Sequence, residues 1–213
     1  MRIFRYNSPL MSVLNRVADM MILNILWLCC SLPVITAGAA TTALYSCLLV
    51  KDDAPVVRRF FTAFKSDFGR STVLLGIWLI GMLLIAVDVF FYIYLLRDMD
   101  IWFRVLPMIP AALILMTSSY LFPLQAKFEN RLSALLKNAV LMTLVHLPTS
   151  ILITVINLLP LFLLYFGTSL FIYLLAVWTL FGFALLATAN AHLIDKVFCL
   201  HIQQEAESTN SEP

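Results

Sequence analysis

Long apolar runs separated by short polar segments organise this chain. The first run extends from Val17 to Val50 and is interrupted at Pro33. A helix needs about 20 apolar residues to cross a bilayer, so this run is too long for one straight span and barely long enough for two. Because proline ends or kinks a helix, we expect helices over 17–32 and 39–50, joined by a turn at Thr36–Gly38.

Four further apolar runs follow. We expect the fourth span to be limited by the helix-breaking Pro107, Pro110 and Pro123, and the fifth to bend near Pro148 and Pro160. The third to sixth spans are predicted over Thr72–Leu96, Val105–Leu124, Ala139–Leu163 and Leu170–Leu193.

Two polar segments between the spans have amphipathic patterns. In Lys51–Arg70, five apolar side chains recur at steps of three and four, which predicts one apolar stripe on a helix at the membrane surface. Gln125–Asn138 has a similar pattern. The alternative is that these helices bind a cytoplasmic partner. The candidate contacts to headgroups or to a partner are Arg58, Arg59, Lys65, Glu129 and Arg131.

Composition fixes the broad class. Of the 213 residues, 62% are hydrophobic and 12% are charged, whereas soluble domains average about 25% charged residues. The apolar excess must face lipid. We therefore expect an all-α, polytopic helical membrane bundle. Residues 1–202 are predicted to form one membrane domain, and the acidic tail 203–213 is expected to be disordered.

The distribution of positive charge bears on topology. If the first run is a hairpin, all but two of the 14 lysines and arginines fall on one side of the membrane. Lysine and arginine favour cytoplasmic loops. This pattern favours six membrane-embedded helices with both termini in the cytoplasm. A re-entrant first pair is a variant, and a single kinked crossing that gives five spans is the alternative.

The broken first run also carries a series of hydroxyl groups. A broken helix in a transporter exposes backbone groups that can bind a solute. The alternative is that the hydroxyls satisfy the backbone or bind neighbouring helices. The residues of this candidate solute site are Pro33, Thr36, Gly38, Thr41, Thr42 and Tyr45.

Two polar residues inside later spans are further candidates. Asp88 is costly in lipid, so it is either functional or paired with a nearby arginine. His146 could transfer protons, or bond a backbone group freed by the kink at Pro148. No group of residues has the spacing of a metal site, and no phosphate-binding loop or nucleophile elbow is present. We therefore expect no metal, no cofactor, no enzymatic activity and no nucleic-acid partner.

Several separated motifs resemble a known family. They are Leu-Trp-Leu and Ser-Leu-Pro-Val-Ile-Thr within Asn24–Tyr45, Phe-Phe-x-Ala-Phe-Lys within Phe60–Phe68, Phe-Pro-Leu-x-Ala-x-Phe-Glu-Asn within Phe122–Ala139, and the stretch Asn190–Phe198. Together they resemble the YesL-like family of bacterial multi-pass membrane proteins, a domain of unknown function. One departure is Gly38-Ala39, where the family usually has Gly-Pro.

The resemblance implies a place in the bacterial inner membrane and an association with carbohydrate uptake, but it supplies no catalytic residues. The leading expectation is an accessory protein that binds a permease or a cytoplasmic partner through the two surface helices. The alternative is a small solute transporter with its site at the broken first helix.

Overall fold

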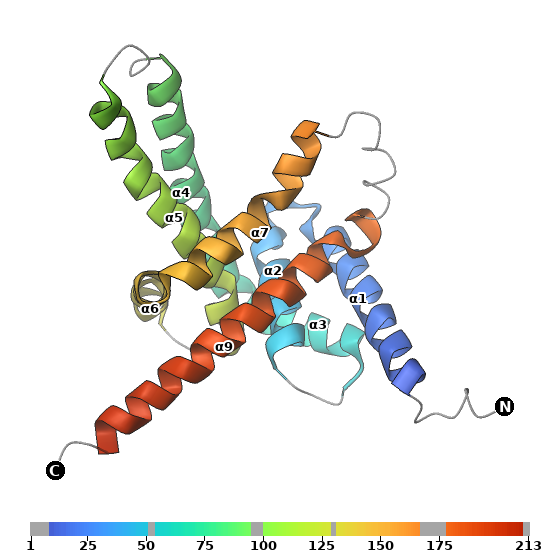
Figure 1. The fold of residues 1–213 in the computed structure, drawn as a ribbon. Helices are drawn as coiled ribbons and strands as arrows, with labels where there is room; N and C mark the ends of the chain where they lie inside the picture. The colour runs from blue at the N-terminus through green and yellow to red at the C-terminus, as the bar shows by residue number, and fades with distance from the viewer. Residues whose placement is uncertain (1–8, 51–53, 95–99, 129–130, 167–177, 211–213) are drawn as a thin grey trace.

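The computed structural model describes residues 9–50, 54–94, 100–128, 131–166 and 178–210. Every regular element in these ranges is a helix (Figure 1), which confirms the all-α class. In chain order the elements are α1 (Pro9–Ser31), α2 (Val34–Leu49), α3 (Val56–Ser66), α4 (Phe68–Tyr94), α5 (Ile101–Lys127), α6 (Leu132–Val145), α7 (Leu147–Phe166), the π-helical turn η1 (Trp178–Gly182) and α9 (Phe183–Asn210).

The predicted hairpin at the start of the chain is formed by α1 and α2, which pack against each other. Its turn lies at Leu32 and Pro33 rather than at Thr36–Gly38, so that part of the prediction was wrong. The Thr36 hydroxyl donates to the Cys30 carbonyl at 2.6 Å, and its N–H donates to the Pro33 carbonyl at 3.0 Å. Thr36 therefore satisfies one carbonyl at the end of α1 and the carbonyl of Pro33 at the break, and α2 begins before Gly38.

Helix α2 is the centre of the molecule (Figure 1) and packs against α1, α3, α4, α5 and α9. Gly38 makes one of these contacts possible: a Cβ atom there would lie 2.5 Å from the Ser71 carbonyl oxygen of α4. Next to it, the Ser71 hydroxyl donates to the Thr42 hydroxyl at 2.9 Å. In membrane proteins, small residues let two helices approach closely, and buried hydroxyls form hydrogen bonds between them.

Helices α4 and α5 form a long pair that projects from the rest of the molecule (Figure 1). We expected Pro107, Pro110 and Pro123 to limit the fourth span, but all three lie inside α5. That expectation was wrong because membrane helices tolerate proline where local adjustment and neighbouring groups satisfy the freed carbonyls.

The predicted second surface helix, Gln125–Asn138, is not formed. Its first residues continue α5 to Lys127, and its last residues open α6 at Leu132. The predicted fifth span is divided between α6 and α7, which meet at 104° around His146, beside the bend expected near Pro148. That the pair makes one crossing stays a prediction. In Figure 1, α6 is seen end-on while α7 lies across the view.

One surface helix remains, and its apolar stripe is only partly exposed. On α3, Phe60 is fully buried in the core cluster and Phe64 packs against that cluster. Val57 and Phe61 are about 40% exposed, and so is Phe68, which the structure places at the start of α4 instead of on α3. The helix is thus attached to the protein by half of its stripe, and the other half is free to contact lipid.

The chain ends in one long helix, α9. Helix α9 continues to Asn210, and residues 211–213 lie outside the described ranges. The expected disorder of the tail from Gln203 onward stays a prediction. Gln, Glu and Ala are good helix formers, so polarity alone did not end the helix.

Three described helices are long and apolar enough to cross a bilayer: Leu14–Ser31 in α1, Phe68–Tyr94, and Val105–Lys127 in α5. The bent pair of α6 and α7 would add a fourth. Helix α2 has 16 residues, about 24 Å, which is shorter than the hydrocarbon core. Six membrane-embedded helices, and the five-span alternative, therefore stay predictions. The first part of the sixth span, residues 170–177, lies outside the described ranges.

The two described ends of the chain lie at the same end of the molecule. In Figure 1 the start of α1, the end of α9 and α3 all lie toward the bottom, and the facing ends of α4 and α5 lie at the top. That both termini face the same side of a membrane stays a prediction. Which end faces the cytoplasm stays a prediction.

Candidate functional site

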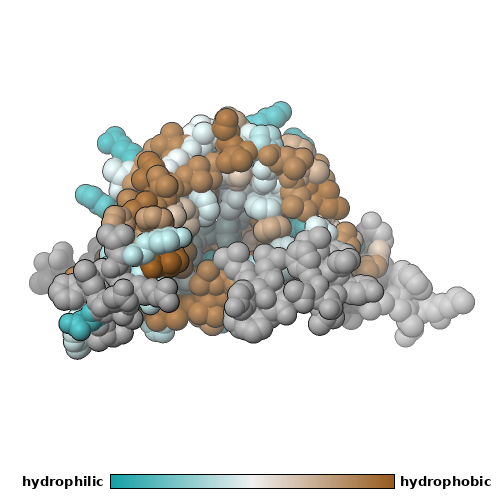
Figure 2. All heavy atoms as spheres, turned by 90° about the horizontal axis from the view of Figure 1, so that it is seen from above, coloured by the Kyte–Doolittle hydropathy of each residue, from teal (hydrophilic) through white to brown (hydrophobic). Residues whose placement is uncertain are grey.

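A cavity of about 500 Å³ lies between α1, α2, α4, α5 and α7. Seen from above, the molecule is hollowed at its centre, with paler side chains inside and a mainly apolar rim (Figure 2). The polar residues in the lining are Thr41, Tyr45, Ser118, Ser119, Thr154 and Asn157, and the aromatic ones include Trp27, Trp78 and Phe122. No charged residue is among the described residues that line it.

The hydroxyl-bearing residues of α2 lie on different faces of the helix, and only one of these faces lines the cavity. Thr41 and Tyr45 are four residues apart, so they share the helix face that lines the cavity. Thr42 lies on the neighbouring face, where it contacts α4 beside Gly38. Pro33 is exposed at the hairpin turn next to Thr36. Of the six residues predicted as a solute site, the structure brings two into the cavity, and the other four shape the hairpin and its packing.

A chain of side-chain hydrogen bonds joins four helices at the cavity. Asn157 on α7 donates to the Ser119 hydroxyl of α5 at 3.1 Å. Asn190 on α9 donates to the Asn157 side-chain oxygen at 2.6 Å and, at 3.4 Å, to the Tyr45 hydroxyl of α2. Nearby, the Trp27 indole donates to Thr41 at 3.1 Å.

This network leaves hydrogen-bonding capacity unused. Asn190 is 2% exposed, and its side-chain oxygen has no partner among the described residues. The Tyr45 hydroxyl accepts from Asn190, so its own proton can still be donated. Unsatisfied buried polar groups are costly and rare. Asn190 lies outside the lining, so its free oxygen belongs to the network behind the cavity. The described lining itself presents aromatic faces together with hydroxyl and amide groups, and no charged side chain.

Sequence reasoning missed Asn157 and Asn190. A signal for both was available, because an amide inside an apolar run is costly in lipid and usually contacts another helix. Trp78, Ser118 and Ser119 had no such signal, since Trp and Ser occur on every kind of membrane-helix face.

The two intramembrane candidates do not line the cavity. Asp88 is half-buried on α4 and has no hydrogen bond or ion pair within the described ranges. His146 is the residue between α6 and α7, and its ring Nε2 is buried without a partner in the described part of the chain.

The backbone freed at the α6–α7 bend is satisfied by another residue. The Ser150 hydroxyl lies 3.0 Å from the His146 carbonyl and 3.2 Å from the Thr143 carbonyl. It is also 3.0 Å from the Tyr120 hydroxyl of α5. Ser150, rather than the ring of His146, therefore takes the backbone role that we considered for the histidine.

Three of the cationic candidates, Arg58, Arg59 and Lys65, lie on α3. Arg59 donates from its guanidinium to the carbonyls of Cys47 and Val50, so it caps the carboxyl end of α2. Arg58 and Lys65 are exposed on α3, and Arg131 is exposed just before α6. Glu129 lies outside the described residues. Among the described residues, no group of His, Cys, Asp and Glu could hold a metal ion.

Comparison with known proteins gives one match. Residues 20–89 match the family model described as "Protein of unknown function, DUF624". The match covers about a third of the chain, from within α1 to within α4, and so includes the central helix. No curated protein and no solved structure matches the chain. The similarity to a domain of unknown function agrees with the coarse expectation, and the more specific YesL-like resemblance stays a prediction.

Proposed function

We propose that this chain is a non-enzymatic bacterial membrane protein of solute uptake whose central cavity binds a neutral, polyhydroxylated solute such as a carbohydrate. The observation that carries the proposal is the lining of the cavity. Asn157 and its hydrogen-bonded neighbours lie beside aromatic side chains, and no charged residue is found among the described lining residues.

The chemistry of the lining favours a carbohydrate over other solutes. A sugar has apolar C–H faces that pack on aromatic rings, and hydroxyls that both donate and accept hydrogen bonds. Trp27 and Trp78 offer such rings, while the Tyr45 hydroxyl in the lining holds an unused donor. A charged solute would have to lose its hydration without a counter-charge, which is costly. The volume of about 500 Å³ is in the range of small-molecule sites.

Binding can be followed through the tryptophans of the cavity. We would titrate the full-length protein in mild detergent with neutral mono- and disaccharides, and with amino acids as charged solutes of similar size, and record tryptophan fluorescence. We expect saturable binding of a neutral sugar. In Asn157→Leu the affinity should fall at least about tenfold, because the variant removes a hydrogen bond and leaves its partners unpaired.

The matched control is Asn138→Leu, which removes an amide that does not line the cavity. It should bind as the unmodified chain does. If no neutral sugar binds, or if both leucine variants bind equally well, the proposal is wrong. Uptake of the bound sugar into liposomes that contain only this protein would identify a transporter, and binding without uptake would indicate an accessory protein.

An accessory role through α3 is the second candidate function. It is supported by the exposed cations Arg58 and Lys65 on the one surface helix of the described chain. A permease or cytoplasmic partner would contact this face. Arg58→Glu with Lys65→Glu should abolish co-purification of that partner from native membranes while the protein still inserts. Unchanged co-purification would exclude this face. Arg59 is left intact because it caps α2.

A further inference from the structure

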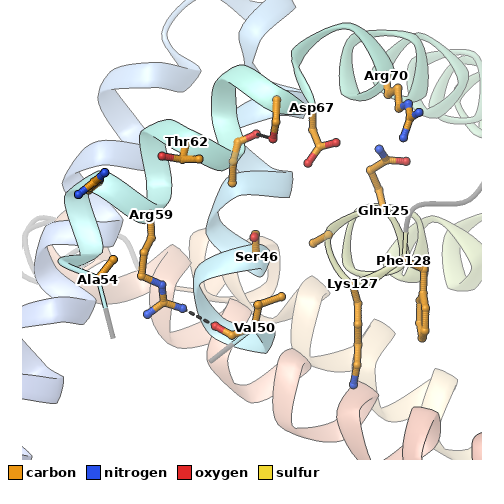
Figure 3. A pocket seen from close by; sticks show the side chains of 14 residues that line it. Ser46, Val50, Ala54, Arg59, Thr62, Asp67, Arg70, Gln125, Lys127 and Phe128 are labelled. Atoms are coloured by element: carbon orange, nitrogen blue, oxygen red, sulfur yellow. Dashed lines mark hydrogen bonds between the residues drawn. The ribbon is translucent and has the colours of Figure 1, made fainter. Parts of the chain in front are cut away.

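A second hollow, a groove of about 920 Å³, lies at the end of the molecule that carries α3. The carboxyl end of α2, one face of α3, the start of α4 and the end of α5 form it (Figure 3). It shares no lining residue with the central cavity. The two sites can therefore be tested separately.

The described lining of this groove is rich in positive charge. Its cations are Arg58, Arg59, Arg70 and Lys127, and its one described carboxylate is Asp67. Two of these cations have partners: Arg59 binds the end of α2, and Lys127 forms an ion pair with Asp195.

Lys127 also lies over the Phe198 ring at 5.0 Å, which helps to fix its position. Arg58 and Arg70 are exposed and have no carboxylate partner among the described residues. Part of the positive charge of the groove is therefore fixed in place, and the two free arginines can turn toward a ligand.

A buried amide at the wall of the groove gives an independent indication of a ligand. Gln125 is 4% exposed, and its side-chain oxygen has no partner in the described part of the chain. In Figure 3 its side chain points toward Asp67 and Arg70. A buried acceptor without a donor is costly, and a ligand hydroxyl would satisfy it. The Asp67 carboxylate would accept a hydroxyl in the same way.

We infer that this groove binds a phosphorylated polyol. The phosphoryl oxygens would bind Arg58 and Arg70, because guanidinium groups match phosphate geometry and form charge-assisted hydrogen bonds. The hydroxyls would donate to Gln125 and Asp67. Two sources share this chemistry: the headgroup of phosphatidylglycerol, and a free ligand such as glycerol 3-phosphate. The inference goes beyond the proposed function, which concerns the other cavity.

The test uses four probes on the full-length protein in detergent. Calorimetric titration would measure glycerol 3-phosphate against methyl phosphate, which has a phosphoryl group but no polyol. Native mass spectrometry would measure retention of phosphatidylglycerol against phosphatidylcholine. We expect glycerol 3-phosphate to bind more tightly than methyl phosphate, or phosphatidylglycerol to be retained more than phosphatidylcholine, or both. Retention of the lipid alone would identify a headgroup site, and binding of glycerol 3-phosphate alone would identify a soluble ligand.

Three variants separate a built site from general surface charge. Arg58→Gln with Arg70→Gln should weaken the preferred ligand at least about tenfold. Gln125→Met should reduce the preference for glycerol 3-phosphate over methyl phosphate without weakening methyl phosphate. Lys65→Gln removes an exposed cation of α3 that does not line the groove, and should have no effect.

The inference fails if the unmodified chain prefers no polyol phosphate, or if Lys65→Gln weakens binding as much as the arginine pair. Thermal unfolding of each variant checks that it is folded. Should Gln125→Met unfold, the comparison of the arginine pair with Lys65→Gln still decides. Neutral sugar binding in the central cavity should be unchanged in the arginine variant, so failure of one proposal is distinguishable from failure of the other.

Discussion

Replacing Gly38 by alanine should separate the two helices that hold the centre of the molecule together. The added Cβ atom would lie 2.5 Å from the Ser71 carbonyl oxygen and 2.9 Å from Leu75 Cβ. Both contacts are far shorter than the ordinary 3.4 Å. Because Ser71 presents a backbone atom, no side-chain rotation can relieve the clash, and α2 must move away from α4 by about 0.9 Å.

Three free-energy terms decide the magnitude. Overpacking of this kind costs about 1–3 kcal/mol. The same displacement would stretch the 2.9 Å bond between Ser71 and Thr42 beyond hydrogen-bonding distance, at about 1 kcal/mol. Alanine also stabilises the helix by up to about 1 kcal/mol relative to glycine, because its helix propensity is higher. The net free energy of unfolding should fall by about 1–4 kcal/mol, which lowers Tm by roughly 2–16 °C in a chain of this size.

Gly76→Ala is the matched control, because a Cβ atom at that position of α4 meets nothing within 4 Å. Circular dichroism of both variants in the same mild detergent, at one heating rate, would give the comparison. Gly76→Ala should leave Tm unchanged or raise it slightly. If Gly38→Ala is as stable as the unmodified chain, the close approach of α2 to α4 is not what requires glycine there.

Three further predictions concern polar contacts between helices. Ser150→Ala should lower the free energy of unfolding by about 1–2 kcal/mol, because it leaves the Tyr120 hydroxyl unpaired. The double variant with Tyr120→Phe should lose less stability than the two single variants together. Additive losses in denaturant titrations would contradict the contact. Asn24→Leu should cost about 2–3 kcal/mol in thermal unfolding and expose the π-helical turn to protease. Asn24 donates to the Thr179 carbonyl of that turn at 2.7 Å and accepts from the Ala184 amide of α9 at 2.9 Å. Unchanged protection would refute this. Arg59→Gln should lower Tm by a few degrees, because the carboxyl end of α2 loses its cap. The neighbouring Arg58→Gln should leave Tm unchanged. Equal Tm values for the two variants would show that the cap contributes nothing.

The sequence by itself determined the class of the protein and much of its local structure. A hydrophobic fraction of 62% leaves no alternative to a membrane environment, and the position of Pro33 forces a break in the first apolar run. The stripe on α3 was also readable, because the period of a helix assigns its residues to faces. A bend near Pro148 was also readable, although its angle of 104° was not. The continuity of α5 through three prolines was not readable, since it depends on which neighbours satisfy the freed backbone groups.

Only the tertiary structure decided which polar residues meet. Thr41 lines the cavity and Thr42 does not, although both belong to the same hydroxyl series. Asn157 and Asn190 are 33 residues apart and become one hydrogen-bonded pair. The physical reason is that apolar helix faces fit lipid and protein almost equally well, so the pattern along the chain shows that a face is apolar without showing what covers it. Packing makes that choice, and it also gathers the polar groups that the lipid excludes.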